Sequence, residues 1–418
     1  MRKIILTLTL TGMAFLPSLV PTHVRAEIQA ISEIEILRAA IKTSPDYQAV
    51  FKNAAEEKAD AQQEGRLGNP TLELKSVRTS TPVDDTQSYD VEIEQPLKLS
   101  QLTGARTILS NTLYEQAELR EQHGILQAYW SIKTLYAMAW QAQEQVKLYT
   151  DFQKRAQDVS DKIGKSVKAG QTPISEGSLF AGDVAKFGSD LEKTKSDSAQ
   201  LRLQLEKATG LNLSGVVLEK PILPAVERDI PTLESQAYQN ASLVRLLETD
   251  LRAAERQKNA ALADSALPEI APRFIYGRNP DENEDSVGFG VVLTIPLWDR
   301  NQSERQKADA SRLYAQRQLD TLQTLPLSER LVRIVDAVDL LDRRISALND
   351  KALPNYRKGF TQAQKSFNAG QTDAATLWQI RERLFETEQQ ALDAILESIE
   401  ARRILSLETG IMPQEVTP

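Results

Sequence analysis

Apolar and polar residues alternate in two short parts of the chain. In residues 89–94 each apolar residue is followed by an acidic one, and in residues 287–295 apolar residues recur at every second position. A period of two predicts strands with one apolar and one polar face. We expect two hairpins, with strands at about 70–79 and 88–95 and at about 268–278 and 286–295. Such strands approach the ~9–11 residues of a tilted membrane strand, although half-buried soluble sheets show the same pattern.

The polar face of these predicted hairpins carries charges of both signs. If the strands belong to a membrane barrel, these side chains face its lumen. Four strands are too few to close a barrel, and an open edge is not tolerated in lipid. The chain must therefore form oligomers, or its strands lie outside a membrane. The expected lumen-facing residues are Glu73, Lys75, Asp90, Glu92, Glu94 and Arg273.

Long helices follow each hairpin. Residues 98–172 contain no proline, and apolar residues recur at coiled-coil spacing, as in Tyr129, Ile132 and Tyr136. We expect a helix at about 98–164 and a return helix at 173–208, then a helix at about 299–366 and a return helix at 373–408. A helix of some 65 residues spans about 100 Å. Pro326 and Pro354 should interrupt the second long helix.

An internal duplication relates these elements at an offset of 200 residues. Pro96-Leu97 recurs at 296–297, Lys165-Ser166 at 365–366, and Thr209-Gly210 at 409–410. We infer a first repeat at 27–210, an irregular linker at 211–231 and a second repeat at 232–418. Each repeat opens with a helical segment, at 31–65 and 233–265. The fold class is therefore mainly α with a small β part.

The same sequence marks the far turn of both repeats. Ala169, Gly170, Gln171 and Thr172 recur unchanged as Ala369, Gly370, Gln371 and Thr372. The glycines can adopt a positive φ and end one helix. We expect the threonines to cap the next helix, with Pro173 and Asp373 at its first position. A turn needs the glycine and the cap but not the glutamine, so the repeated glutamine indicates a further role.

The N-terminus is typical of a secretory signal. Arg2 and Lys3 precede an uncharged apolar stretch at 4–20, and a cleavage motif ends at Ala26. We expect residues 1–26 to be removed; the alternative is an uncleaved membrane anchor. No later stretch is long and apolar enough for a spanning helix.

Composition excludes several classes of function. The chain has no cysteine and 2 histidines, one of which leaves with the signal, so catalysis by His or Cys has little support. Loss of three basic residues with the signal changes 50 basic and 58 acidic residues to 47 and 58, a net charge of −11. Such a chain is a poor nucleic-acid binder. We expect no enzyme activity, no cofactor and no metal site.

Two such repeats resemble the TolC family of outer-membrane efflux channels. The matching residues are Gln95-Pro96-Leu97, residues 295–297 and the two tip segments at 168–172 and 368–372. The resemblance implies a homotrimer whose chains form one 12-stranded membrane β-barrel, continued by a helical α-barrel through the periplasm. It also implies two partners, a periplasmic membrane-fusion adaptor and an inner-membrane pump of the resistance-nodulation-division type.

Within that family, Leu353-Pro354 and the chain length are most like the cobalt-zinc-cadmium resistance branch. The resemblance then implies a passive exit duct for divalent heavy-metal cations such as cobalt, zinc, cadmium or nickel. A drug-efflux or type I secretion channel of the same family is an alternative. A secreted periplasmic coiled-coil structural or adaptor protein is an alternative from another class.

The resemblance also suggests where partners and gates lie. The tip segments would dock the adaptor, through Ala169, Gly170, Gln171, Thr172 and their counterparts at 369–372. Acidic residues near the tips constrict the tunnel in some relatives. Here Glu176 and Asp373 are the candidates for such a gate, although acids at a helix start serve the helix dipole equally well.

Overall fold

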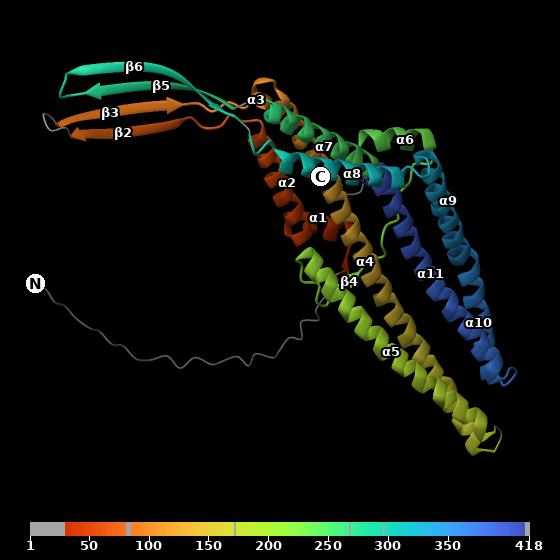
Figure 1. Ribbon diagram of the computed structural model, residues 1–418. Helices are drawn as coiled ribbons and strands as arrows, with labels where there is room; N and C mark the ends of the chain where they lie inside the picture. Colours follow the sequence, from red (N-terminus) through yellow and green to blue (C-terminus); the bar gives the residue numbers. More distant parts are fainter. Residues whose placement is uncertain (1–29, 81–84, 171–172, 267–268, 296, 414–418) are drawn as a thin grey trace, which may run out of the picture.

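A computed structural model describes residues 30–80, 85–170, 173–266, 269–295 and 297–413. The helices form an elongated body, and a four-stranded sheet projects from one end of it (Figure 1). The tips of two helical hairpins lie at the other end (Figure 1). The predicted signal peptide, with its cleavage after Ala26, lies outside the described residues. Among the described helices, none is both long and apolar enough to cross a bilayer.

The two copies contain similar elements in the same order. The first copy comprises α1 (Glu33–Thr43), α2 (Pro45–Glu64), β2 (Thr71–Ser80), β3 (Asp85–Glu94), α3 (Leu99–Leu102), α4 (Ala105–Lys168) and α5 (Ile174–Thr209). The second comprises α6 (Ile230–Gln239), α7 (Leu243–Ala266), β5 (Glu269–Asn279), β6 (Glu284–Thr294), α8 (Gln302–Leu322), α9 (Leu327–Ser346), the π-helical segment η1 (Ala347–Ala352), α10 (Leu353–Asn368) and α11 (Ala374–Thr409). Strands β1 (Ala30–Ile31) and β4 (Val217–Leu218) form a small parallel pair.

The long helices differ from their predicted bounds. The first begins at Ala105 and not near residue 98, because Gly104 adopts φ 75° and separates it from the short α3. The helix predicted at 299–366 is interrupted at Pro326, as expected, but not at Pro354. It breaks before Pro326, which lacks the N–H that would continue the ladder. Pro354 only follows η1 at the start of α10, so the helical path continues there.

Each predicted opening segment is also two helices. Ser44 ends α1 and caps α2, since its side chain accepts a hydrogen bond from the Asp46 amide. Pro45 occupies the first turn of α2, where a missing N–H costs nothing. In the second copy, Asn240 ends α6 before α7 begins. The segments therefore break at these joints, where the recurring Thr-Gly pairs meet them.

The recurrence of Thr-Gly at 209–210 and 409–410 has a steric reason. Gly210 and Gly410 both have positive φ and end a return helix. A Cβ on Gly210 would lie 2.7 Å from the Thr43 carbonyl oxygen, and one on Gly410 would lie 2.7 Å from the Ser242 amide nitrogen. Each return helix thus ends against the joint of its own opening helices, which only glycine permits.

The largest core cluster lies where α1, α4, α5 and α11 meet. Tyr129, Ile132 and Tyr136, which the coiled-coil spacing identified, are fully buried there. The same cluster contains a buried ion pair between Lys133 Nζ and Glu33 Oε1 at 2.8 Å. The second oxygen of Glu33 accepts the Ile222 amide at 2.7 Å. This carboxylate therefore joins the N-terminal helix, the long helix and the linker.

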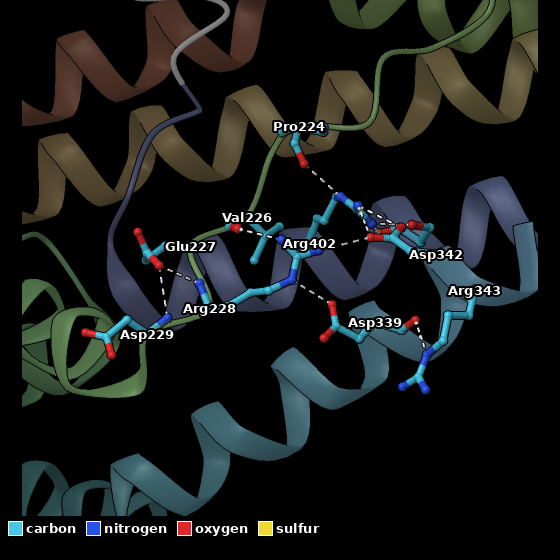
Figure 2. A network of polar contacts seen from close by, with 10 residues as sticks. Pro224, Val226, Glu227, Arg228, Asp229, Asp339, Asp342, Arg343 and Arg402 are labelled. Atoms are coloured by element: carbon cyan, nitrogen blue, oxygen red, sulfur yellow. Dashed lines mark hydrogen bonds and ion pairs between the residues drawn. The ribbon is translucent and has the colours of Figure 1, made fainter. Parts of the chain in front are cut away.

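Hydrogen bonds of two arginines attach the linker between the copies to α9 and α11 (Figure 2). Arg402 of α11 donates from Nε to the Pro224 carbonyl at 2.9 Å and from Nη2 to Asp342 of α9 at 2.8 Å. Arg228 of the linker donates to Asp339 of α9 at 2.9 Å. Arg402 is 6% exposed, so its pairs are shielded from water. The linker predicted as irregular is therefore held across α9 and α11.

His123 is a packing residue in α4, as expected for a lone helical histidine. Its Nδ1 lies 2.9 Å from the Ala241 carbonyl oxygen and its Nε2 lies 3.0 Å from Gln127 Nε2. Because a carbonyl only accepts, Nδ1 carries the proton and Nε2 accepts from the amide. This arrangement requires a neutral ring.

We predict that stability falls on acidification through this histidine. Burial lowers the pKa of His123 below its ordinary value of 6.5. Below that value the unfolded chain binds more protons than the native chain, so the free energy of unfolding decreases as the pH falls. Thermal unfolding followed by circular dichroism between pH 7 and 5 should show a steeper loss for the native protein than for His123→Gln. Parallel curves would contradict the assignment.

Candidate functional site

The sheet has one exposed apolar face. Strands pair in the order β2-β3-β5-β6, and the register places Leu74 opposite Val91, Val91 opposite Tyr276, and Phe274 opposite Phe289. Phe289 is 84% exposed and Leu74 is 71% exposed. An uncovered apolar face is typical of a surface that contacts lipid or another protein. The other exposed apolar side chains of this face include Leu72, Tyr89, Ile93, Val287, Val291 and Leu293.

The apolar face is bordered by ion pairs at one end and by a tryptophan at the other. Toward the hairpin turns, Arg78 pairs with Asp85 at 2.9 Å and Arg278 with Asp285 at 3.1 Å. Toward the helices, Trp298 follows β6 and is 87% exposed. Trp and Tyr are enriched at membrane–water interfaces. The apolar face therefore has limits along the strands, as expected for a band of fixed height.

The opposite face carries the six charged residues predicted to face a lumen. The register places Glu73 opposite Glu92, Lys75 opposite Asp90, and Arg273 opposite Glu94. All six therefore lie on one face of the sheet, which alternation had predicted. That this face lines a lumen stays a prediction.

These side chains form a row of ion pairs, called the charge ladder below, and not a simple acidic surface. Lys75 Nζ lies 2.9 Å from Glu92 and 3.3 Å from Glu73. Arg273 lies 3.0 Å from Glu92 and 2.7 Å from Glu94. Glu92, between the two cations, is 8% exposed. Four acids and two bases leave a modest negative excess, and the described residues provide no ion pair for Asp90.

The two tips share one backbone structure. Gly170 and Gly370 have φ values of 74° and 70°, as the sequence predicted. The amides of Ala169 and Ala369 both donate to the lysine carbonyl four residues earlier, at 3.1 Å. Gln371 donates its amide to the Ser366 carbonyl at 2.9 Å. Gln171 and Thr172 lie outside the described residues, as does Pro296 of the repeated Pro-Leu pair.

The predicted caps of the return helices are wrong by one residue. Asp373, not Thr372, caps α11, and its side chain accepts the Thr376 amide at 2.7 Å. Pro173 occupies the N-cap position of α5 and makes no side-chain cap. The hydrogen bond from the Thr376 amide lowers the pKa of Asp373. This carboxylate is therefore engaged in capping, while Glu176 lies in the first turn of α5.

Sequence reasoning missed a buried arginine near the tips. Arg381 of α11 is 3% exposed and lies on the same buried stripe as Leu377 and Phe385. Its guanidinium carbon is 3.9 Å from the ring centre of Phe152 in α4. The sequence signal for this residue was a charged side chain within an apolar stripe of helical period.

The described residues contain no group of three or more His, Cys, Asp or Glu side chains suited to a metal ion.

Comparison with curated proteins reveals two similar chains. The cobalt-zinc-cadmium resistance protein CzcC of Cupriavidus metallidurans is 23% identical over 79% of this chain and 79% of its own length. The nickel-cobalt-cadmium resistance protein NccC of Alcaligenes xylosoxydans xylosoxydans is 23% identical over 69% of this chain and 66% of its own. No protein-family model matches the sequence. The expected similarity to the cobalt-zinc-cadmium branch is thus confirmed.

Solved structures share the fold over most of the chain. The outer membrane protein VceC of Vibrio cholerae superposes with a TM-score of 0.71 at 14% identity, covering 90% of this chain and 95% of that one. The CmeC outer membrane channel of Campylobacter jejuni gives 0.71 at 12% identity, covering 91% and 86%. The chain has the fold of these channels, with long helices joined to a small sheet, which confirms the expected fold class.

Proposed function

We propose that this chain is the outer-membrane channel of a tripartite efflux system and conducts divalent heavy-metal cations out of the periplasm. The observation that carries this proposal is the isolated four-stranded sheet, with one exposed apolar face and one charged face, in the fold of outer-membrane channels. The channel acts as a passive duct, and the energy comes from a pump in the inner membrane. It has no catalytic role.

The sheet edges support a trimer. Within the described part of the chain, strands β2 and β6 each have a neighbour on one side only. In hydrocarbon, a strand edge must pair because water is absent. Three copies of the four-stranded sheet make a closed barrel of 12 strands when β6 of one protomer pairs with β2 of the next. The apolar face then contacts lipid and the charge ladder faces the lumen.

The helices extend the duct away from the membrane. Helix α4 has 64 residues, which corresponds to about 96 Å at 1.5 Å per residue. The tips lie at the opposite end of the molecule from the sheet (Figure 1). In the proposed channel, this length extends from the outer membrane deep into the periplasm. Both tips are available for a periplasmic adaptor, and the first also exposes Ile174 at 77% and Leu179 at 64%. We assign adaptor docking to residues 169–172 and 369–372.

The charge ladder suits conduction of cations. Conduction requires attraction that is strong enough for entry and weak enough for exit. Glu73, Glu92 and Glu94 are partly neutralised by their basic neighbours, which limits their affinity for a divalent ion. The names of the two curated relatives support cobalt, zinc, cadmium or nickel as cargo. Glu176 and Asp373 are the candidates for an acidic constriction at the tips.

Substitution on the two faces of β6 should distinguish lipid from lumen. Phe289→Arg places a charge on the apolar face, where arginine at the bilayer centre costs about 2–4 kcal/mol. Gly288→Arg is the matched control, because Gly288 is the neighbouring residue on the opposite face. We expect heat-modifiable, SDS-resistant trimers in the outer membrane for Gly288→Arg and a strong reduction for Phe289→Arg. Equal amounts would contradict the assignment of faces.

A deletion strain tests the cargo. Loss of the gene should lower the tolerated concentrations of Zn²⁺, Co²⁺, Cd²⁺ or Ni²⁺, because these ions would no longer leave the periplasm. Growth inhibition is measured for each ion and, in parallel, for hydrophobic antibiotics. Unchanged metal tolerance with new antibiotic sensitivity would replace the metal proposal by drug efflux.

The same assay tests the tips through complementation. The double variant Gln171→Ala/Gln371→Ala should assemble normally yet fail to restore metal tolerance, because the adaptor contact is weakened. Gln318→Ala, on the exposed surface of α8, is the control and should restore tolerance. Full complementation by the tip variant would remove the docking role from these glutamines. A soluble periplasmic monomer would contradict the channel altogether.

A further inference from the structure

A groove runs between α4 and α10 near the tips. It contains two cavities of about 350 Å³ and 270 Å³, and Arg155, Phe360 and Arg381 line both of them. Arg155 of α4 stacks on Phe360 of α10, with 5.4 Å between the guanidinium carbon and the ring centre. Arg381 reaches the same place from α11. Three helices from both hairpins thus meet at two arginines.

The charge of Arg381 lacks a counter-ion. Its Nη1 is buried and has no hydrogen-bond partner, and its Nη2 lies 3.5 Å from the Asp151 carbonyl oxygen, a long contact. No carboxylate among the described residues forms an ion pair with it. Stacking on Phe152 compensates part of the lost hydration. A buried guanidinium without an anion is nevertheless costly.

Burial and nearby charge both act on this group. Burial and, to a smaller extent, the positive charge of Arg155 lower the pKa of Arg381 to about 9, although the Asp151 and Asp158 carboxylates nearby act in the opposite direction. At neutral pH the guanidinium therefore keeps its charge in an unfavourable position. An anion between the two arginines would compensate the buried charge and offset the repulsion between the two guanidinium groups.

The larger cavity has a positive excess. Four basic side chains and two acidic ones line it. Lys162 stands beside it and donates to Asn368 Oδ1 at 2.6 Å. A volume of about 350 Å³ lies within the range of small-molecule sites and suits an anion larger than chloride. The basic residues are Arg155, Lys162, Lys165 and Arg381, and the acidic ones are Asp158 and Asp161.

We propose that this groove binds a small multivalent oxyanion, namely a di- or tricarboxylate or a phosphate. The planar guanidinium of Arg381 binds one carboxylate or phosphate group through two parallel hydrogen bonds, a geometry that favours arginine over lysine. Arg155 and Lys162 bind the remaining charge. The anion thereby links α4 of the first hairpin to α10 and α11 of the second. The site does not depend on the transported cargo.

Binding can be measured on the full mature protein in detergent. Citrate and inorganic phosphate are titrated by isothermal calorimetry at constant ionic strength, with chloride as the reference. We expect saturable binding of at least one of the two oxyanions. Arg381→Met should weaken it roughly tenfold or more, because a charge-assisted pair is lost. Arg344→Met is the control, since Arg344 of α9 forms an exposed ion pair with Glu397 of α11. The affinity of this variant for the oxyanion should equal that of the native protein.

Thermal unfolding separates this site from a purely structural arginine. Without oxyanion, Arg381→Met should be as stable as the native protein or more stable, because an unpaired buried charge is removed. It should also lose the stabilisation that citrate or phosphate gives the native protein. A variant that is destabilised yet equally responsive to the oxyanion would overturn the proposal.

A second variant keeps the test valid if Arg381→Met does not assemble. Arg155 is half-exposed, and Arg155→Gln should assemble and bind the oxyanion more weakly. Absence of saturable binding to the native protein would overturn the proposal. Native affinity in both Arg155→Gln and Arg381→Met would do the same, because the binding would then come from other surface cations.

Discussion

A strand in hydrocarbon must find a protein partner for every backbone N–H and C=O group, because the lipid offers none. Within one chain, β3 and β5 meet this requirement, since each has a neighbour on both sides. Strands β2 and β6 do not. The two copies of the duplicated unit are joined in one sheet by the β3–β5 pairing, so the edges of that sheet come from different copies. In the proposed channel, a closed assembly of several chains satisfies this constraint.

Local patterns were enough to predict the strands and the tip turns. In β6 the alternation of residues 287–293 fixes which side chains share a face, whatever the neighbouring strands are. Gly170 and Gly370 took a positive φ as predicted, because the αL position at a helix end favours glycine over other residues. The order of helices and hairpins also followed from local signals, since proline and glycine mark most of the breaks.

Long-range contacts could not be predicted in this way. The role of Arg381 depends on Phe152, which lies in the other copy, and nothing near either residue indicates the contact. The hydrogen bond from Arg402 to Pro224 and the ion pair of Arg402 with Asp342 depend on how α11 meets the linker and α9. The cap of α11 was misplaced because Thr372 and Asp373 are both good caps, and the backbone chooses between them. The docking and gating roles of the tip residues remain predictions.

In the proposed channel, β2 and β6 of neighbouring protomers pair, and three protomers close one barrel. The chain contains no cysteine, so disulfide scanning reports this contact directly. One cysteine replaces Ser76 in β2, and a second is moved through residues 285–293 of β6. We expect covalent trimers on denaturing gels, at alternate β6 positions only, and none for single-cysteine controls. Folded protein in the outer membrane that forms no cross-link at any position, or only dimers, would contradict this pairing.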